Sequence, residues 1–213
     1  MGRDPEDRPS LGISATELRH VAQIAALCEI RLLDLFACFL IPLYTLLFTH
    51  DTRWFTTNFS VIAAARDQRH GFFLWGMLVG VYLLCVLLPV MAALPRPLWP
   101  RLCLLGGFLL LSAVVLPYTP DELPKIADLH VICAFTASCL LVLSLFLLLL
   151  QKARQDRQRY WDCMKWLGVT VLLSLVLFAM VGIISSALEI FFVLSTTLLA
   201  RRLWYLERGG GKN

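Results

Sequence analysis

Apolar residues in this chain gather into long blocks that are separated by short polar segments. Six of these blocks are long enough to cross a bilayer as helices, because the hydrocarbon core takes about 20 residues of helix. They cover residues 31–49, 71–94, 99–117, 130–151, 163–182 and 184–203. The pattern predicts an all-α fold, a polytopic integral membrane protein with six transmembrane helices.

The last two predicted helices are almost fused. Between Trp166 and Ala200 the only charged residue is Glu189, and this run is far too long for a single crossing. A tight turn near Gly182 would divide it into two antiparallel spans, since glycine accepts the backbone angles that such a turn needs.

The positions of Lys and Arg predict how these helices are oriented. With six spans, fifteen of these cations fall on the side of the two termini and four on the other side. Short loops rich in Lys and Arg stay in the cytoplasm, so both termini should be cytoplasmic, with residues 50–70 and 118–129 external. The predicted domains are a cytoplasmic segment with an amphipathic helix (1–30), a six-helix membrane domain (31–204) and a disordered cytoplasmic tail (205–213).

Composition narrows the classes of function. The hydrophobic set makes up 59% of the chain and charged residues only 16%, whereas soluble domains carry about 25% charged residues. The net charge of +4 comes mostly from the segments between spans, so it sets topology and gives no reason to expect a nucleic-acid partner. None of the seven cysteines belongs to a C-x-x-C pair, and we expect neither a zinc-thiolate site nor another cofactor.

The single carboxylate of the last span is the first candidate for chemistry. A charge at the centre of a membrane helix costs roughly 2.5–3.5 kcal/mol on insertion scales. Glu189 follows Ser185 and Ser186 at helical spacing, and Thr196 lies on the same face. This face is too polar to meet lipid, so we expect Glu189 to point into the bundle or into a cavity that opens outward.

Other polar residues are predicted at the same outer end of the bundle. His70 begins the second span and His130 the fourth, and the first external loop carries Arg66 and Arg69. The candidate catalytic residues are therefore Glu189, His130 and His70, and the candidate anion-binding residues are Arg66, Arg69, Ser185 and Ser186.

Three interpretations of these residues remain open. Glu189 could be a hydrogen-bonded contact between helices, with the histidines at the membrane interface. Alternatively, His70, His130 and Glu189 could form a headgroup-binding or acid/base site, with an arginine holding a phosphate. A third possibility is a metal site built from the histidines and carboxylates Asp67, His70, Asp128, His130 and Glu189.

Three stretches of the chain resemble a known superfamily. They are Asn58-Phe59-Ser60 after the first span, His130 at the start of the fourth, and LEIFFVLSTTLLARRLW in the last. The pattern is similar to the superfamily that groups the FGF-receptor-activating protein, the damage-regulated autophagy modulators, the yeast Sfk proteins and a GPI-anchor lipid-remodelling factor. The resemblance implies six spans, cytoplasmic termini, a long first external loop and a lipid-linked role.

Together these features predict a membrane protein that engages or processes lipid headgroups through an outward-facing polar pocket. Membrane lipids would be its partners, with a membrane-protein partner or a second copy as a further possibility. Two alternatives belong to other classes: a small transporter or channel that uses Glu189 as a proton or cation site, and a non-catalytic membrane scaffold. A transporter needs a polar path through the bundle, and the inner half offers few residues to line one.

Overall fold

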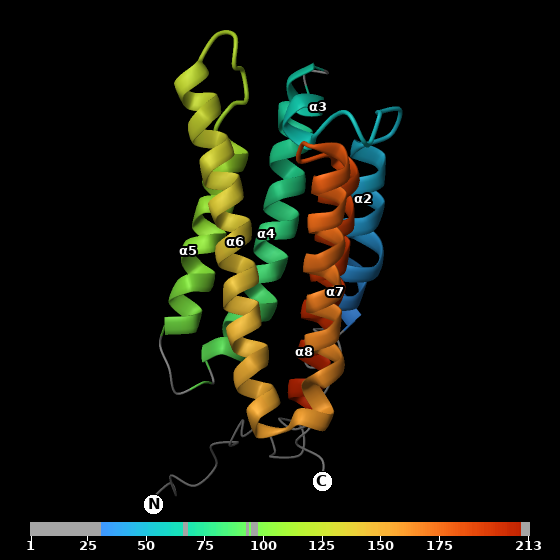
Figure 1. Ribbon diagram of the computed structural model, residues 1–213, viewed down its shortest axis with the longest axis vertical. Helices are drawn as coiled ribbons and strands as arrows, with labels where there is room; N and C mark the ends of the chain where they lie inside the picture. Colours follow the sequence, from blue (N-terminus) through green and yellow to red (C-terminus); the bar gives the residue numbers. More distant parts are fainter. Residues whose placement is uncertain (1–30, 66–67, 93, 95–97, 210–213) are drawn as a thin grey trace, which may run out of the picture.

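The computed structural model describes residues 31–65, 68–92, 94 and 98–209, and these form a bundle of long helices (Figure 1). The first helix covers Arg31–Phe48 and contains the π-helical turn η1 (Phe36–Leu40) and α2 (Ile41–Phe48). It is followed by α3 (Phe59–Ala65), α4 (Arg69–Ala92), α5 (Leu98–Val115), α6 (Pro124–Gln155), α7 (Arg157–Val181) and α8 (Ser186–Gly209). Within these ranges there is no strand, so the prediction of an all-α fold is confirmed.

Five of the helices are long and apolar enough to cross a membrane: Arg31–Phe48, α4, α5, α6 and α7. Large apolar side chains cover their outer surfaces, and Met180 (79% exposed) and Phe108 (66% exposed) are examples. A soluble protein rarely leaves so much apolar area in water. The chain is therefore a multi-pass membrane protein. In α8 the eighteen residues from Ser186 carry three charges, which sets this helix apart from the other five.

Successive long helices run in opposite directions, so their connections alternate between the two ends of the bundle (Figure 1). The connections from α2 to α3, from α5 to α6 and from α7 to α8 lie at one end, which we call the α3 end. The α6–α7 turn lies at the opposite end, which we call the α6–α7 end. Gly182 makes the turn before α8 with φ of +77°, a left-handed conformation that favours glycine, as the sequence predicts.

Close packing joins α4 to α5. A Cβ atom added at Gly76 would lie 2.3 Å from Val114 Cγ2, and one added at Gly107 would lie 2.6 Å from Leu84 Cδ2. Only glycine allows this approach of the two helices, a common arrangement in membrane bundles. The helix α8 also joins several helices, because it packs against α4, α7 and the first helix.

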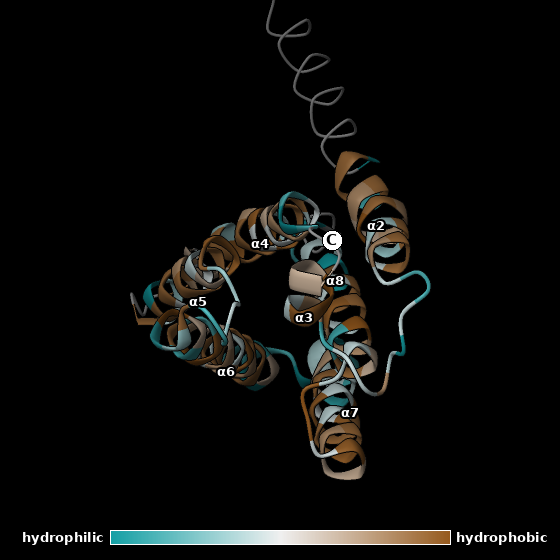
Figure 2. Ribbon diagram, turned by 90° about the horizontal axis from the view of Figure 1, so that it is seen from above, coloured by the Kyte–Doolittle hydropathy of each residue, from teal (hydrophilic) through white to brown (hydrophobic). Residues whose placement is uncertain are grey.

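The segment between the first helix and α4 contains a helix that was not predicted from the sequence. Within residues 50–70, which we expected to be external, Phe59–Ala65 forms α3, whose apolar face enters the end of the bundle. Viewed from above, α3 lies beside the axis and over α8 (Figure 2). Phe59 is fully buried, with its ring 4.7 Å from that of Trp75 on α4 and 5.6 Å from that of Phe48 on α2.

Two other boundaries differ from the prediction. The helix α8 continues to Gly209, five residues beyond the predicted end of the membrane domain, because side chains of this last turn are bonded to other helices: Tyr205 to Asp34, and Glu207 to Lys152 and Tyr160. The helix α6 begins at Pro124, six residues before the predicted start of the fourth span, because proline is well suited to the first turn of a helix. The predicted N-terminal helix (1–30) and residues 210–213 lie outside the described residues.

Candidate functional site

The first turn of α3 is the centre of the polar network at the α3 end. Asn58 caps this helix, because its side-chain Oδ1 accepts the backbone N–H of Val61 at 2.8 Å. Its carbonyl accepts the N–H of Ile62 at 3.0 Å, which closes the first helical turn. Asparagine is among the preferred residues for this position. The next two residues, Phe59 and Ser60, contact side chains from other helices.

Glu189 on α8 contacts the first of these residues. Its Oε2 accepts the backbone N–H of Phe59 at 2.8 Å, and the side chain is partly buried. The first N–H groups of a helix have no partner within it, and a carboxylate there also interacts favourably with the helix dipole. Glu189 therefore points into the bundle, as predicted, where it accepts a backbone donor that α3 cannot satisfy itself.

His130 on α6 contacts the second residue. Its side chain is buried, and Nε2 lies 2.7 Å from Ser60 Oγ. On the other side of the ring, Nδ1 lies 2.7 Å from the carbonyl oxygen of Ala113 and 3.0 Å from that of Leu116. Carbonyl oxygens only accept, so Nδ1 carries the hydrogen of the neutral ring. The Nε2 atom is then an acceptor for the hydroxyl of Ser60.

Ser185 and Ser186 are both fully buried, and Ser186 holds α8 against the loop before α3. The Oγ of Ser185 accepts the N–H of Leu188 at 3.4 Å, near the start of α8. The hydroxyl and the N–H of Ser186 both donate to the carbonyl of Thr57, at 3.0 and 2.7 Å. The hydroxyls that we expected to bind an anion are thus bonded within the protein.

The remaining predicted site residues lie apart from this network. Arg69 and His70 are exposed at the first two positions of α4, and Arg66 lies outside the described residues. Two cavities stand out, of about 390 and 320 Å³, and neither is lined by Glu189, His130 or His70. The described parts of the chain contain no group of three His, Cys, Asp or Glu side chains placed to hold a metal ion.

Ser60 is a residue of this network that sequence reasoning did not propose for a site. The signal was present, because Asn58 precedes a short apolar run, FSVIAAA, that suits a capped helix. Such a helix would place Ser60 in its first turn. What the sequence does not show is that this turn reaches both α6 and α8.

Comparison of the chain with protein-family models, with characterised proteins and with solved structures finds no match. The superfamily resemblance therefore stays a prediction that rests on motif residues. Those residues share one location in the fold: Asn58 and Ser60 are in the first turn of α3, and His130 and Glu189 are bonded to that turn.

Proposed function

We propose that this chain is a six-span protein with cytoplasmic termini that processes ester-linked membrane lipids at the outer surface. In this proposal Ser60 is the nucleophile and His130 the general base. The observation that carries it is the 2.7 Å contact between Ser60 Oγ and His130 Nε2, with the His130 tautomer set by two carbonyl oxygens. A nucleophile beside a base that a third group orients is the usual arrangement for nucleophilic catalysis.

The reaction would follow from the direction of that hydrogen bond. Ser60 Oγ attacks the ester carbonyl carbon of the lipid while its proton moves to His130 Nε2. The proton then passes to the departing alcohol oxygen as the ester bond breaks, which leaves the acyl group on Ser60. Water, or the hydroxyl of a second lipid, removes the acyl group in the reverse sequence and restores the serine.

Glu189 has a positioning role in this proposal. Its carboxylate holds the N–H of Phe59, next to Ser60 in the chain, and so fixes the first turn of α3 against α8. The ring of Phe59 is fixed at the same time between aromatic side chains. Small errors in the position of a nucleophile lower rates strongly. This arrangement replaces our expectation that Glu189 acts directly as an acid or base.

A fluorophosphonate probe, which reacts covalently with activated serines, tests the nucleophile in the purified protein. We expect labelling at Ser60 that is lost in Ser60→Ala and falls at least 10-fold in His130→Gln, since a general base contributes about 10²–10⁴-fold. Ser112→Ala is the matched control, because the hydroxyl of Ser112 donates to the carbonyl of Phe108 within its own helix. Thermal unfolding of each variant shows whether the fold is retained. Equal labelling of Ser60→Ala and the unmodified protein would exclude the nucleophile.

Single-cysteine labelling tests the topology. On a background without the seven native cysteines, we expect a cysteine at Arg53 to react with an impermeant maleimide in intact cells. A cysteine at Arg157 should react only after the membrane is made permeable, because α7 begins at this residue and the α6–α7 turn lies at the opposite end of the bundle (Figure 1). Labelling of position 157 from outside would overturn the proposed orientation.

A further inference from the structure

A groove of about 390 Å³ lies on the surface of α8, outside the polar network. One face of α8 forms its floor, with Ile190, Phe191, Leu194 and Leu198 at helical spacing. Ala187 and Ser195 of α8, Trp54 from the loop before α3 and Trp166 from α7 complete its lining. All of these side chains except that of Ser195 are apolar or aromatic, as in most sites for small apolar ligands.

The groove has the depth of one leaflet. Its lining on α8 extends from Ala187 to Leu198, which is about 16 Å along the helix at 1.5 Å per residue. The hydrocarbon core of a bilayer is about 30 Å thick. The groove begins at the α3 end of the bundle, and its length is close to half of that thickness.

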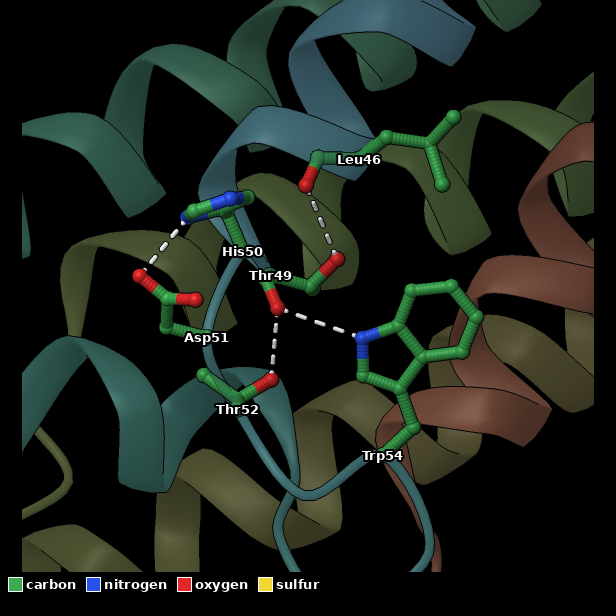
Figure 3. A network of polar contacts seen from close by, with 6 residues as sticks. All are labelled: Leu46, Thr49, His50, Asp51, Thr52 and Trp54. Carbon is green, nitrogen blue, oxygen red and sulfur yellow. Dashed lines mark hydrogen bonds and ion pairs between the residues drawn. The ribbon is translucent and has the colours of Figure 1, made fainter.

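The end of the groove at the membrane surface is closed by a fixed side chain. The indole N–H of Trp54 donates to the carbonyl of Thr49 at 3.2 Å, and the same carbonyl accepts the hydroxyl of Thr52 at 2.7 Å (Figure 3). The carbonyl of Trp54 accepts the N–H of Ala187 at 2.9 Å. Trp54 is thus held by α2 through its side chain and by α8 through its backbone.

Trp166 lines the groove from α7. This residue precedes the end of α7 at Val181 by fifteen positions, or about 22 Å, and Leu198 follows the start of α8 by twelve, or about 18 Å. The two helices are antiparallel neighbours, so Trp166 and Leu198 lie at similar depths. The groove is therefore floored by α8 and lined by Trp54 at the α3 end and by Trp166 farther along the helices.

We infer that this groove binds one acyl chain of a membrane lipid from the leaflet on the α3 side. At this depth the surrounding solvent is lipid, and an apolar groove one leaflet long fits a lipid tail better than a peptide or a polar metabolite. Tight packing in the groove would offset the tail's loss of motion. The headgroup then lies at the Trp54 end, beside the segment 54–60 that leads to Ser60. The groove lies on the face of α8 opposite Glu189, because helical spacing turns its residues between Ala187 and Leu198 away from that side chain. The inference therefore goes beyond the proposed function and does not depend on a reaction at Ser60.

A photoreactive lipid tests the groove without requiring any reaction. The protein is placed in phosphatidylcholine vesicles that contain a small fraction of phosphatidylcholine with a diazirine in the middle of one acyl chain. After illumination, mass spectrometry locates the modified peptides. We expect the α8 segment 187–198 to be modified several-fold more than the exposed lipid-facing segment of α7 around Leu172, which is 61% exposed.

Two variants that fill the groove sharpen this test. Leu194→Trp should lower modification of 187–198 at least 5-fold, and Ser195→Phe serves the same purpose if the first variant does not fold. Leu172→Trp is the matched control, since it adds the same side chain on an open surface and should change nothing. Equal modification of α7 and α8 would overturn the inference, and so would crosslinks to a second copy of the chain in place of lipid.

The Ser60→Ala variant separates the two proposals. If it keeps the crosslink in the groove while fluorophosphonate never labels Ser60 in the unmodified protein, the groove stands and the reaction falls. If Ser60 is labelled but the crosslink is spread evenly over the lipid-facing surface, the reaction stands and the groove falls.

Discussion

The two ends of α8 are held by different kinds of interaction. At the α3 end, Ser186, Ala187 and Glu189 bond to backbone groups of the segment 54–59. At the α6–α7 end, most of the contacts join side chains, and one joins the guanidinium of Arg159 to the carbonyl of Leu206. Arg201 Nε donates to Asp34 Oδ1 at 2.6 Å, and Lys152 Nζ donates to Glu207 Oε2 at 2.6 Å. Tyr160 and Tyr205 donate to the same two carboxylates.

This difference determines whether a second substitution can restore the stability that a first substitution removes. An ion pair can be removed as a pair, because both partners are side chains, and an apolar pair of similar size can take its place. A backbone N–H cannot be removed in the same way. At the α3 end the loss of an acceptor leaves a donor without a partner, and the cost of an unsatisfied group remains. The α3 end is therefore the less replaceable of the two attachments.

The largest loss of stability is expected from Glu207→Leu. Lys152 is only 11% exposed and Glu207 21% exposed, so the change leaves a largely buried ammonium without its carboxylate. Removal of one partner of a buried pair costs about 3 kcal/mol or more. The double variant Lys152→Met/Glu207→Leu should recover most of this loss. Both are measured as the free energy of unfolding in detergent micelles, and a double variant as unstable as the single one would contradict the comparison.

An intermediate effect is expected from Glu189→Leu. This variant leaves the N–H of Phe59 without an acceptor and should lower the free energy of unfolding by about 1–3 kcal/mol. Glu189→Gln keeps an acceptor oxygen in a side chain of the same shape, and it should keep the fold and most of the fluorophosphonate labelling of Ser60. If Glu189→Leu unfolds like the unmodified protein and labels equally well, α3 is not held by this residue.

The smallest effect is expected from Asp34→Asn. The side chains of Asp34 and Arg201 are 32% and 33% exposed, and pairs that reach solvent contribute only about 0.2–1 kcal/mol. Salt screens such pairs, so the stability difference from the unmodified protein should shrink between 0.1 and 1 M salt. The difference caused by Glu189→Leu should stay the same over that range. A salt-dependent loss at Glu189 would mean that charge, and not the hydrogen bond, is what holds α3.

The sequence was sufficient to predict the long helices, because each apolar block corresponds to one of them. It was not sufficient to predict α3, since seven residues are too few to show the helical spacing of apolar residues. A helix this short is also stable only when it packs against the rest of the bundle. The same holds for the last turn of α8. Tyr205 and Glu207 gave no signal of order in the sequence, and their partners lie 171 and 47 or more residues away.

The candidate site was predictable only in part. Glu189 and His130 stand out because a carboxylate and an imidazole are unusual near membrane helices. Their targets could not be predicted, because Glu189 bonds to a backbone N–H, which every residue except proline has. His130 bonds to a serine 70 positions away. Asp34 is likewise paired with Arg201, 167 positions later in the chain.

The bond between Phe59 and Glu189 also has a consequence for the order of assembly. Its two partners are 130 positions apart in the chain, and a ribosome that adds about 5–20 residues per second needs roughly 7–26 s to make that length. During this interval α4 and α6 are made before α8, so α3 can pack against them while the N–H of Phe59 still has no carboxylate to accept it. The position of the proposed nucleophile would then be fixed only when the last helix enters the membrane, and a truncated chain without α8 should show weaker fluorophosphonate labelling of Ser60.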